Sequence, residues 1–394
     1  MVDKAEMRPT MEDVAAAAGV SQMTVSRVMR GTGQTSDKVR KRVQDAARLL
    51  GYVPNRLATA LRDETAPLIA VVLPTLGNRV FSEVLNGVQT TLAGSGVQPV
   101  FGVTEYSAER EEELVRDLLS WRPRGIILPG LEHSQATRAT IRASGVRVAE
   151  VMDIDGDPIS VAFGMSQIAA GRCTAQHMLS KGYRRFGYIG SQGGKDLRAL
   201  KRLEGFRAAI REAGAQIVTQ IIRPEPSSMT VGRRATAEVL AQAHPPQAIY
   251  YSNDDLAAGG IMHCLSEGIA IPSDVALAGF NGLPFLEALP VRLTTVETPR
   301  LQMGVQAALH LSGQETDQDG NQNSDPERHS TGRRVDLGFQ LIDGDTCKGL
   351  ARNSPLGMPQ AALHCPLAKP AGRRRQGRMK VARFGQILRP ARCQ

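Results

Sequence analysis

The chain has 394 residues, of which 42% are hydrophobic and 22% charged, so it is long enough for two or three folded domains with a large core. No run of about eighteen apolar residues and no apolar N-terminal segment occurs, so we expect no membrane span, no signal peptide and a cytoplasmic location. The net charge of +9 is local: residues 348–394 carry eleven Lys and Arg without any Asp or Glu, which leaves 37 basic against 39 acidic residues elsewhere.

The cysteines lack the spacing of a disulfide framework or of a zinc site. We expect reduced thiols and no bound metal. The five positions are Cys173, Cys264, Cys347, Cys365 and Cys393.

Residues 10–29 have the pattern of two short helices joined by a tight turn. Thr10 and Asp13 suit a capping box, Gly19 suits a positive φ in the turn, and Ser21 suits the cap of the second helix. This spacing is typical of a helix-turn-helix, but a helical hairpin inside an ordinary core would show it too. The side chains that we expect to face inward are Val14, Ala15, Ala18, Val20, Val25 and Val28.

A third, amphipathic helix over 37–50 is expected to close a three-helix head. Its basic residues form a local footprint suited to nucleic acid. A segment over 56–62, capped by Asn55, has room for only a turn or two of helix, which is too short to be stable alone. The expected inward residues are Val39, Val43, Ala46, Ala47 and Leu50, and the basic ones are Lys38, Arg40, Lys41 and Arg42.

From Pro67 onward, apolar β-branched runs alternate with helical segments. Two such series, before and after about Ser166, predict an α/β fold with two Rossmann-like lobes of parallel sheet. Ligands of such sheets bind at the carboxyl ends of the strands, here between the lobes. Residues 312–333 have the composition of a flexible insertion, and residues 348–394 form either a nucleic-acid-binding arm or an extension without a function.

Several stretches resemble the LacI (lactose-repressor) family of bacterial transcription factors. DVAAAAGVSQMTVSRVMRG resembles the DNA-binding head of that family, and LTTVETPRLQMG and SNDDLAAGGIMHCLSEGIAIPSDVALAGFNG resemble its periplasmic-binding-protein-like sensor. The resemblance implies a head at 8–54, a hinge helix and linker at 55–66, a two-lobed effector-binding and dimerisation core at 67–347, and a basic tail at 348–394. It implies a homodimeric repressor that binds double-stranded operator DNA.

The match also assigns DNA contacts to residues of the head and hinge. Gln22, Met23 and Arg27 match the recognition helix, where Gln suits adenine, Arg suits guanine and Met suits a thymine methyl group. Leu61 matches the hinge leucine that enters the minor groove, although it could instead pack against the head. The expected phosphate contacts are Thr24, Ser26 and Asn55.

No catalytic motif or cofactor motif occurs in the core, so we expect an effector site rather than an enzyme. Arg202 matches the family's effector-binding arginine, and its guanidinium suits a carboxylate or a pair of hydroxyls. Asn253 and Asp254 match the family's Asn-Asp pair at the cleft. Phe81 could form an apolar wall of the cleft or belong to the core.

Two departures from the family bear on the effector. Phe280-Asn281-Gly282 stands where many neutral-sugar binders have acidic residues, and Ser166-Gln167 replaces the usual Asp-Asn. Fewer carboxylates would repel an anion less, so Asn281 is expected at a site for a sugar acid, as in the gluconate-type repressors that the chain resembles. The alternatives are a repressor that responds to a neutral sugar, and a sugar-binding protein without a regulatory role.

Overall fold

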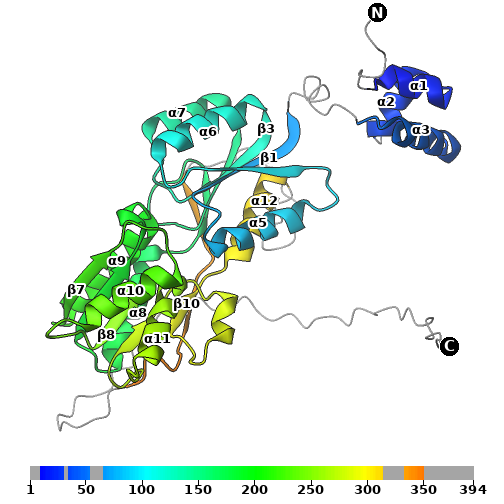
Figure 1. Ribbon diagram of the computed structural model, residues 1–394. Coiled ribbons are helices and arrows are strands. Elements are labelled where there is room, and N and C mark those ends of the chain that lie inside the picture. Colours follow the sequence, from blue (N-terminus) through cyan, green and yellow to red (C-terminus); the bar gives the residue numbers. More distant parts are fainter. Residues whose placement is uncertain (1–8, 31–33, 54–64, 314–331, 350–394) are drawn as a thin grey trace, which may run out of the picture. The chain divides into compact units, whose positions relative to one another are not determined.

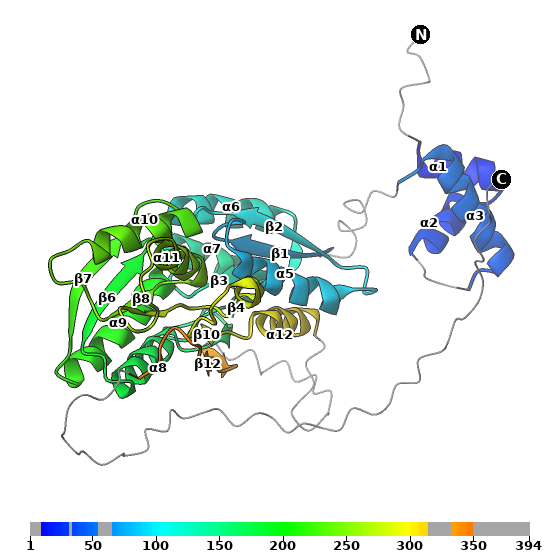
Figure 2. The same ribbon diagram turned by 60° about the horizontal axis from the view of Figure 1, so that its bottom comes forward.

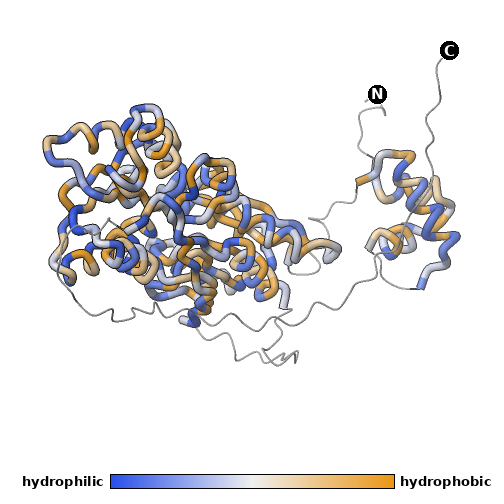
Figure 3. Tube along the Cα trace, turned by 90° about the horizontal axis from the view of Figure 1, so that it is seen from below, coloured by the Kyte–Doolittle hydropathy of each residue, from blue (hydrophilic) through white to orange (hydrophobic). Residues whose placement is uncertain are grey.

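The computed structural model describes residues 9–30, 34–53, 65–313 and 332–349. Helices α1 (Met11–Ala18), α2 (Gln22–Arg30) and α3 (Asp37–Leu50) form the head, which contains both apolar and polar residues (Figure 3). The capping box of Thr10 and Asp13 is present, and Gly19 has a φ of 61°. Leu50 differs from its prediction: it is 37% exposed, so the buried face of α3 ends at Ala47.

The first lobe is a parallel six-stranded sheet between two pairs of helices (Figure 1). In the order β11-β5-β4-β3-β1-β2, its strands are Arg333–Asp336, Val161–Gly164, Arg147–Val151, Pro123–Pro129, Ala66–Leu73 and Gln98–Val103. Helices α5 (Arg79–Leu92) and α12 (Arg300–Ser312) cover one face, and α6 (Ala108–Ser120) and α7 (Gln135–Ser144) cover the other.

The second lobe repeats this architecture around a four-stranded parallel sheet (Figure 2). In the order β7-β6-β8-β9, its strands are Gln216–Ile222, Arg185–Gly190, Ala248–Tyr251 and Ala276–Ala278. Helices α8 (Gln167–Ser180) and α9 (Leu197–Glu212) pack on one face, and α10 (Met229–Leu240) and α11 (Asp254–Ser266) pack on the other. The α/β fold of two parallel lobes predicted from the sequence is therefore confirmed.

The chain passes between the lobes three times. It crosses between β5 and α8, between β9 and α12, and between β11 and β12 (Gln340–Ile342). Strand β12 pairs antiparallel with β10 (Thr295–Glu297) beside the second lobe. The segment over 333–347 therefore forms two strands in different sheets, because its first half pairs with β5 and its second half with β10.

Helices α8 and α9 touch backbone to backbone through two glycines. A Cβ atom on Gly205 would lie 2.0 Å from the carbonyl oxygen of Ile168, and one on Gly171 would lie 1.8 Å from that of Arg202. This close packing fixes the position of Arg202 along the axis of α8. The same arrangement joins α5 to α12 and α10 to α11, through Gly87 with Gly304 and Gly232 with Gly259.

Replacing Gly205 with Ala is expected to lower the free energy of unfolding by about 1–3 kcal/mol or more, because overpacking two helix backbones forces them apart. Urea denaturation measures the change. Glu204→Ala is the control, since Glu204 is exposed on the same helix. An unchanged urea midpoint for the Gly205 variant would contradict the close helix contact.

Candidate functional site

Helix α2 turns a polar face to solvent because its two valines are buried. Val25 is fully buried and Val28 nearly so, while Met23 is 63% exposed. The Arg27 guanidinium lies 3.5 Å from the sulfur of Met23, one turn earlier. Gln22 is also exposed, so the three expected base-reading side chains lie on the accessible surface of the head.

The expected phosphate-contacting residues are less accessible. Thr24 and Ser26 are half-buried, and the Thr24 hydroxyl lies 2.9 Å from that of Ser21, which caps α2. Asn55 and Leu61 lie outside the described residues.

The basic footprint predicted on α3 divides into two roles. Arg42 donates to the carbonyl oxygens of Ala18 and Gly19 and so closes the end of α1. The Arg42 guanidinium therefore stabilises the fold of the head by joining α3 to the end of α1. Lys38 and Lys41 remain exposed, and Arg40 forms a surface ion pair with Asp37.

Between the two lobes lies a small polar cavity of about 20 Å³, here called the inner hollow. Both lobes and the chain crossings contribute to its wall. It is lined by Asn78, Val80, Met152, Met165, Gln167, Asp196, Arg198, Arg202, Asn253, Phe280, Asn281, Thr298 and Met303.

Arg202 is buried, and its guanidinium forms part of the wall of the inner hollow. One terminal nitrogen donates to the Gln167 side-chain oxygen at 2.6 Å, and the other donates to the Ser252 carbonyl oxygen at 3.0 Å. The guanidinium carbon lies 3.8 Å from the centre of the Phe280 ring. The fully buried Tyr250 side chain also interacts with Arg202 through a side-chain hydrogen bond, so the guanidinium is held from several sides at the cavity wall.

Asn253 and Asn281 also line this cavity. The Asn253 side chain caps α11 by accepting from Leu256 N at 3.2 Å, and its amide nitrogen donates to the Ser227 hydroxyl at 2.6 Å. Asn281 has a φ of 122°, a strained backbone conformation for a residue other than glycine. Its backbone pairs with Val296 and Thr298 of the chain crossing, which holds its side chain at the cavity.

Asp254 and Phe81, which were expected at the effector site, do not line the inner hollow. Asp254 is fully buried and absent from the cavity wall: its carboxylate accepts from Leu283 N at 2.9 Å and from the Thr295 hydroxyl at 2.7 Å. Its role is to tie α11 to the chain crossing. Phe81 belongs to the core of the first lobe, where its ring lies 5.5 Å from the Arg198 guanidinium.

Burial raises the pKa of Asp254 to about 6, so its charge destabilises the folded protein. Between about pH 4 and 6 the folded state holds this proton more tightly than the unfolded state, and stability falls as the pH rises, by up to about 1.4 kcal/mol per pH unit. Asp254→Asn should remove this fall and leave effector affinity unchanged. Urea denaturation at pH 4.5 and pH 7 measures the pH dependence of stability. A loss of effector binding in Asp254→Asn would show that Asp254 contacts the effector.

A second cavity of about 120 Å³, here called the outer hollow, lies at the carboxyl ends of β1, β2 and β3. Of the residues that the structure describes, Arg198 alone lines both hollows. Sequence reasoning missed Arg198, although it precedes Arg202 by four residues and so shares a helix face with it. The outer hollow is lined by Pro74, Thr104, Tyr106, Ser107, Ala108, Glu111, Pro129, Gly130, Glu132, Lys195, Leu197 and Arg198.

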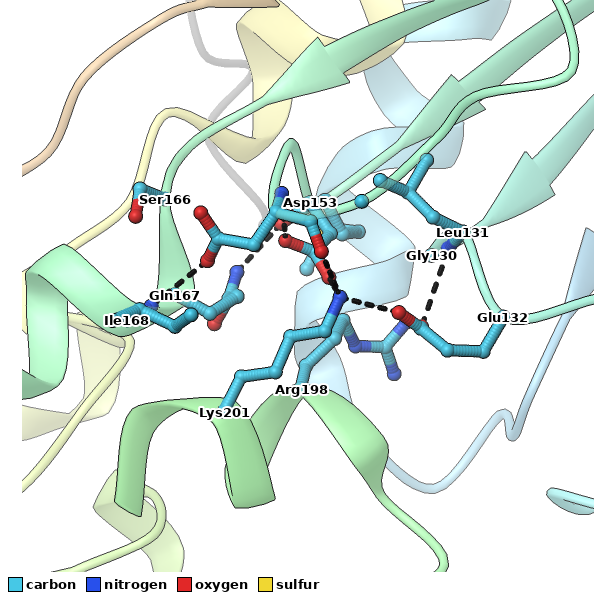
Figure 4. A network of polar contacts seen from close by, with 12 residues as sticks. Gly130, Leu131, Glu132, Asp153, Ser166, Gln167, Ile168, Arg198 and Lys201 are labelled. Carbon is cyan, nitrogen blue, oxygen red and sulfur yellow. Dashed lines mark hydrogen bonds and ion pairs between the residues drawn. The ribbon is translucent and has the colours of Figure 1, made fainter. Parts of the chain in front are cut away.

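Lys201 of α9 joins the two lobes beside these cavities (Figure 4). Its ammonium group lies 2.5 Å from the Asp153 carboxylate and 2.6 Å from the Asp155 carbonyl oxygen, and it also pairs with Glu132. Burial raises the pKa of Asp153, although the Lys201 ammonium opposes this shift. Asp153 and Glu132 follow β4 and β3, so carboxylates that the sequence analysis had not assigned to the cleft do stand at its edge.

Comparison with known proteins identifies the families whose sequence patterns this chain matches. Residues 10–55 match the family of bacterial regulatory proteins named lacI, and residues 175–346 match the periplasmic binding protein-like domain. The chain is 38% identical over 305 residues to the HTH-type transcriptional regulator GntR of Pseudomonas aeruginosa, which covers 77% of this chain and 88% of the relative. It belongs to the LacI family.

Other relatives of this LacI-family regulator agree. The Escherichia coli K12 regulator GntR is 32% identical over 337 residues, covering 86% of this chain and 98% of the relative. A crystal structure of a LacI-family regulator from Silicibacter pomeroyi is 42% identical, has a TM-score of 0.79 and covers 86% and 99% of the two chains.

Membership of the LacI family defines the chain as a DNA-binding transcriptional regulator with an effector-binding core, and not as an enzyme. Regulators of this family bind operator DNA as dimers. Within the described residues, no helix is long and apolar enough to cross a membrane. No cluster of three or more metal-ligating side chains occurs in that part of the chain.

Proposed function

We propose that this regulator represses genes for the use of a sugar acid, and that the acid binds between the lobes and changes operator affinity. The single observation that carries the proposal is the Arg202 guanidinium, a buried positive charge that forms part of the wall of the inner hollow. A carboxylate is the acceptor that such a donor binds best. Asn253 and Asn281 stand at the same cavity and supply hydrogen bonds for hydroxyl groups.

The effector must prefer one arrangement of the lobes in order to act on DNA. Arg202 and Lys201 are neighbours on α9, and Lys201 holds the loops that follow β3 and β4 of the other lobe. An anion bound to Arg202 would therefore lie close to the Lys201 ion pairs that join the two lobes. This proximity supports a coupling between effector binding and lobe arrangement.

For DNA recognition we propose that Gln22, Met23 and Arg27 read base edges, that Thr24, Ser26 and Asn55 hold phosphates, and that Leu61 enters the minor groove. The corresponding domains are a head at 8–54, a hinge at 55–66, a core at 67–347 and a basic tail at 348–394. A homodimer presents two heads related by a two-fold axis, so the operator should be a near-palindrome. The proposed location is the cytoplasm, where operator DNA is found in bacteria.

Calorimetry with the full-length protein tests the effector class. Gluconate and other sugar acids should bind, and glucose and ribose should not. Operator affinity, measured by fluorescence anisotropy, should change only with the acids. If the neutral sugars bind and the acids do not, the protein responds to a neutral sugar instead.

A further inference from the structure

His133 lies in the loop that joins β3 to α7, and its side chain is only 1% exposed. Its Nδ1 atom lies 2.7 Å from the Glu111 carboxylate of α6, and its Nε2 atom lies 3.2 Å from the Gly130 carbonyl oxygen. An ionised carboxylate and a carbonyl oxygen can only accept hydrogen bonds, so each ring nitrogen has to carry a hydrogen. These contacts therefore require a doubly protonated, positively charged imidazolium.

A second carboxylate lies on the other side of the ring. Glu150 of β4 is fully buried, and its Oε1 atom lies 3.6 Å from Nε2 of His133. Its Oε2 atom accepts from Ile159 N at 2.7 Å. Burial raises the pKa of Glu150 to about 7, and the His133 charge opposes this shift. The imidazolium therefore stands between carboxylates from two different elements of the first lobe, α6 and β4.

Charged side chains of α6, β4 and α7 face His133. Besides Glu111 and Glu150, they include Arg138 of α7, which donates to two carbonyl oxygens of neighbouring loops. Burial and the Arg138 charge disfavour the imidazolium, but the two carboxylates outweigh them, so the pKa of His133 is raised. His133 therefore keeps its proton to a higher pH than an ordinary histidine does.

This cluster joins the two loops that hold Lys201 of the second lobe. His133 directly follows Glu132, and Glu150 precedes Asp153 by three residues. Glu132 and Asp153 both pair with the Lys201 ammonium group (Figure 4). Because so little chain separates each carboxylate from the cluster, an ion pair between His133 and Glu150 fixes both partners of Lys201 relative to each other.

We propose that His133 is a positioning residue: its imidazolium ties the β3–α7 loop to β4, and so holds in place the two carboxylates that receive Lys201 when the lobes meet. Loss of the ring proton removes the ion-pair partner of the buried Glu150 and loosens both loops. The effect of the effector on operator affinity therefore becomes weaker as the pH rises. This inference rests on the proposed coupling of effector binding to lobe arrangement, and it does not depend on which acid is the effector.

Both buried groups act in the same direction. The pKa of His133 and the pKa of Glu150 are raised in the folded protein, so each group holds its proton more tightly there than in the unfolded chain. The stability that they contribute is fully present below their unfolded values and is lost as the pH rises through their folded values. For Glu150 this loss occurs around pH 7, and for His133 it lies above 6.5, the ordinary value of a histidine.

The first test is an NMR titration of the full-length protein labelled with nitrogen-15 in its histidine rings. At pH 6.5 both ring nitrogens of His133 should carry a hydrogen, and one of them should lose it at a pH above the ordinary range of histidine. His133→Gln identifies the two signals by their disappearance. A neutral His133 ring at pH 6.5 would overturn the proposal.

The second test measures operator affinity by fluorescence anisotropy, with and without gluconate, at pH 6.5 and pH 9. In the wild type, the change in affinity caused by gluconate should shrink about three- to tenfold at pH 9, the value of one hydrogen bond. His133→Gln should show the reduced change at both pH values. His244→Gln is the matched control, because His244 is exposed on the second lobe, and it should behave as the wild type does.

Two further variants separate positioning from a general loss of structure. Glu150→Gln removes the charge but keeps the size of the side chain, and it should reduce the response as His133→Gln does. In a Lys201→Ala background, His133→Gln should have no additional effect, because the carboxylates that it positions then lack this partner. Thermal melting of each variant checks that it is folded.

The outcomes separate this inference from the proposed function. If gluconate does not bind the wild type at either pH, the sugar-acid function is wrong, and the NMR titration still decides the charge of His133. If gluconate acts but His133→Gln keeps the pH dependence of the wild type, the positioning role is overturned. An equal effect of His133→Gln with and without the Lys201 ammonium group would overturn it as well.

Discussion

Replacing Arg202 with Ala is expected to abolish the response to a sugar acid while the protein still binds its operator. Truncating one partner of a buried, hydrogen-bonded charge pair costs about 2–5 kcal/mol, which lowers effector affinity roughly 30- to 5000-fold. Calorimetry measures the affinity, and fluorescence anisotropy of labelled operator measures the response. Arg202→Lys should recover only part of the affinity, because an ammonium group lacks the planar set of donors.

The matched control for Arg202 is Arg207→Ala. Arg207 lies on the same helix, is exposed, and donates to Gln220 away from both hollows. Its removal should leave effector affinity unchanged. Retention of full affinity by Arg202→Ala would refute the anion site, whereas equal losses in both variants would indicate a general effect of charge on α9.

Replacing Arg27 with Ala is expected to weaken operator binding by about 1–3 kcal/mol per half-site, since a bidentate contact to guanine has this value. In a dimer the loss doubles, and base preference should relax at one position of each half-site. The measurement is anisotropy titration against an operator and against variants changed at one base pair. Because the Arg27 side chain is exposed and lies against Met23 of the same helix, folding should be unaffected.

Arg40→Ala is the control for Arg27. Arg40 is also an exposed arginine of the head, but it lies on α3 and pairs with Asp37. Its loss should reduce affinity by a similar factor on all sequences, as expected for a phosphate contact. If Arg27→Ala also weakened every sequence equally, its proposed base contact would be refuted.

The head illustrates what local sequence predicts well. The capping box at Thr10, the left-handed Gly19 and the burial of Val25 all follow from residues within a few positions of one another. Leu50 is the exception: helical periodicity placed it on the buried face, but the head's core does not extend that far along α3. Periodicity predicts which face of a helix is apolar, and it does not predict where the neighbouring helices end.

The cleft shows the opposite case. Tyr106, Glu132, Asp153, Arg198 and Lys201 were not assigned to it from the sequence, because they follow different strands or lie on one helix without a motif of their own. Only the crossing of the chain between lobes brings them together. The edge strand β7 has little sequence signal for a related reason: its residues alternate between exposed and half-buried positions for most of its length.

The sequence alone determined the helix-turn-helix, the two α/β lobes and the family, since these depend on local caps, on periodicity and on contiguous motifs. The tertiary structure decided which polar side chains face the cleft. Asp254 and Asn253 are adjacent in the chain, yet Asn253 lines the inner hollow while Asp254 is turned inward by partners 29 and 41 residues away, Leu283 and Thr295. A buried carboxylate requires hydrogen-bond donors, and the donors that reach Asp254 come from a distant segment that only folding brings to it.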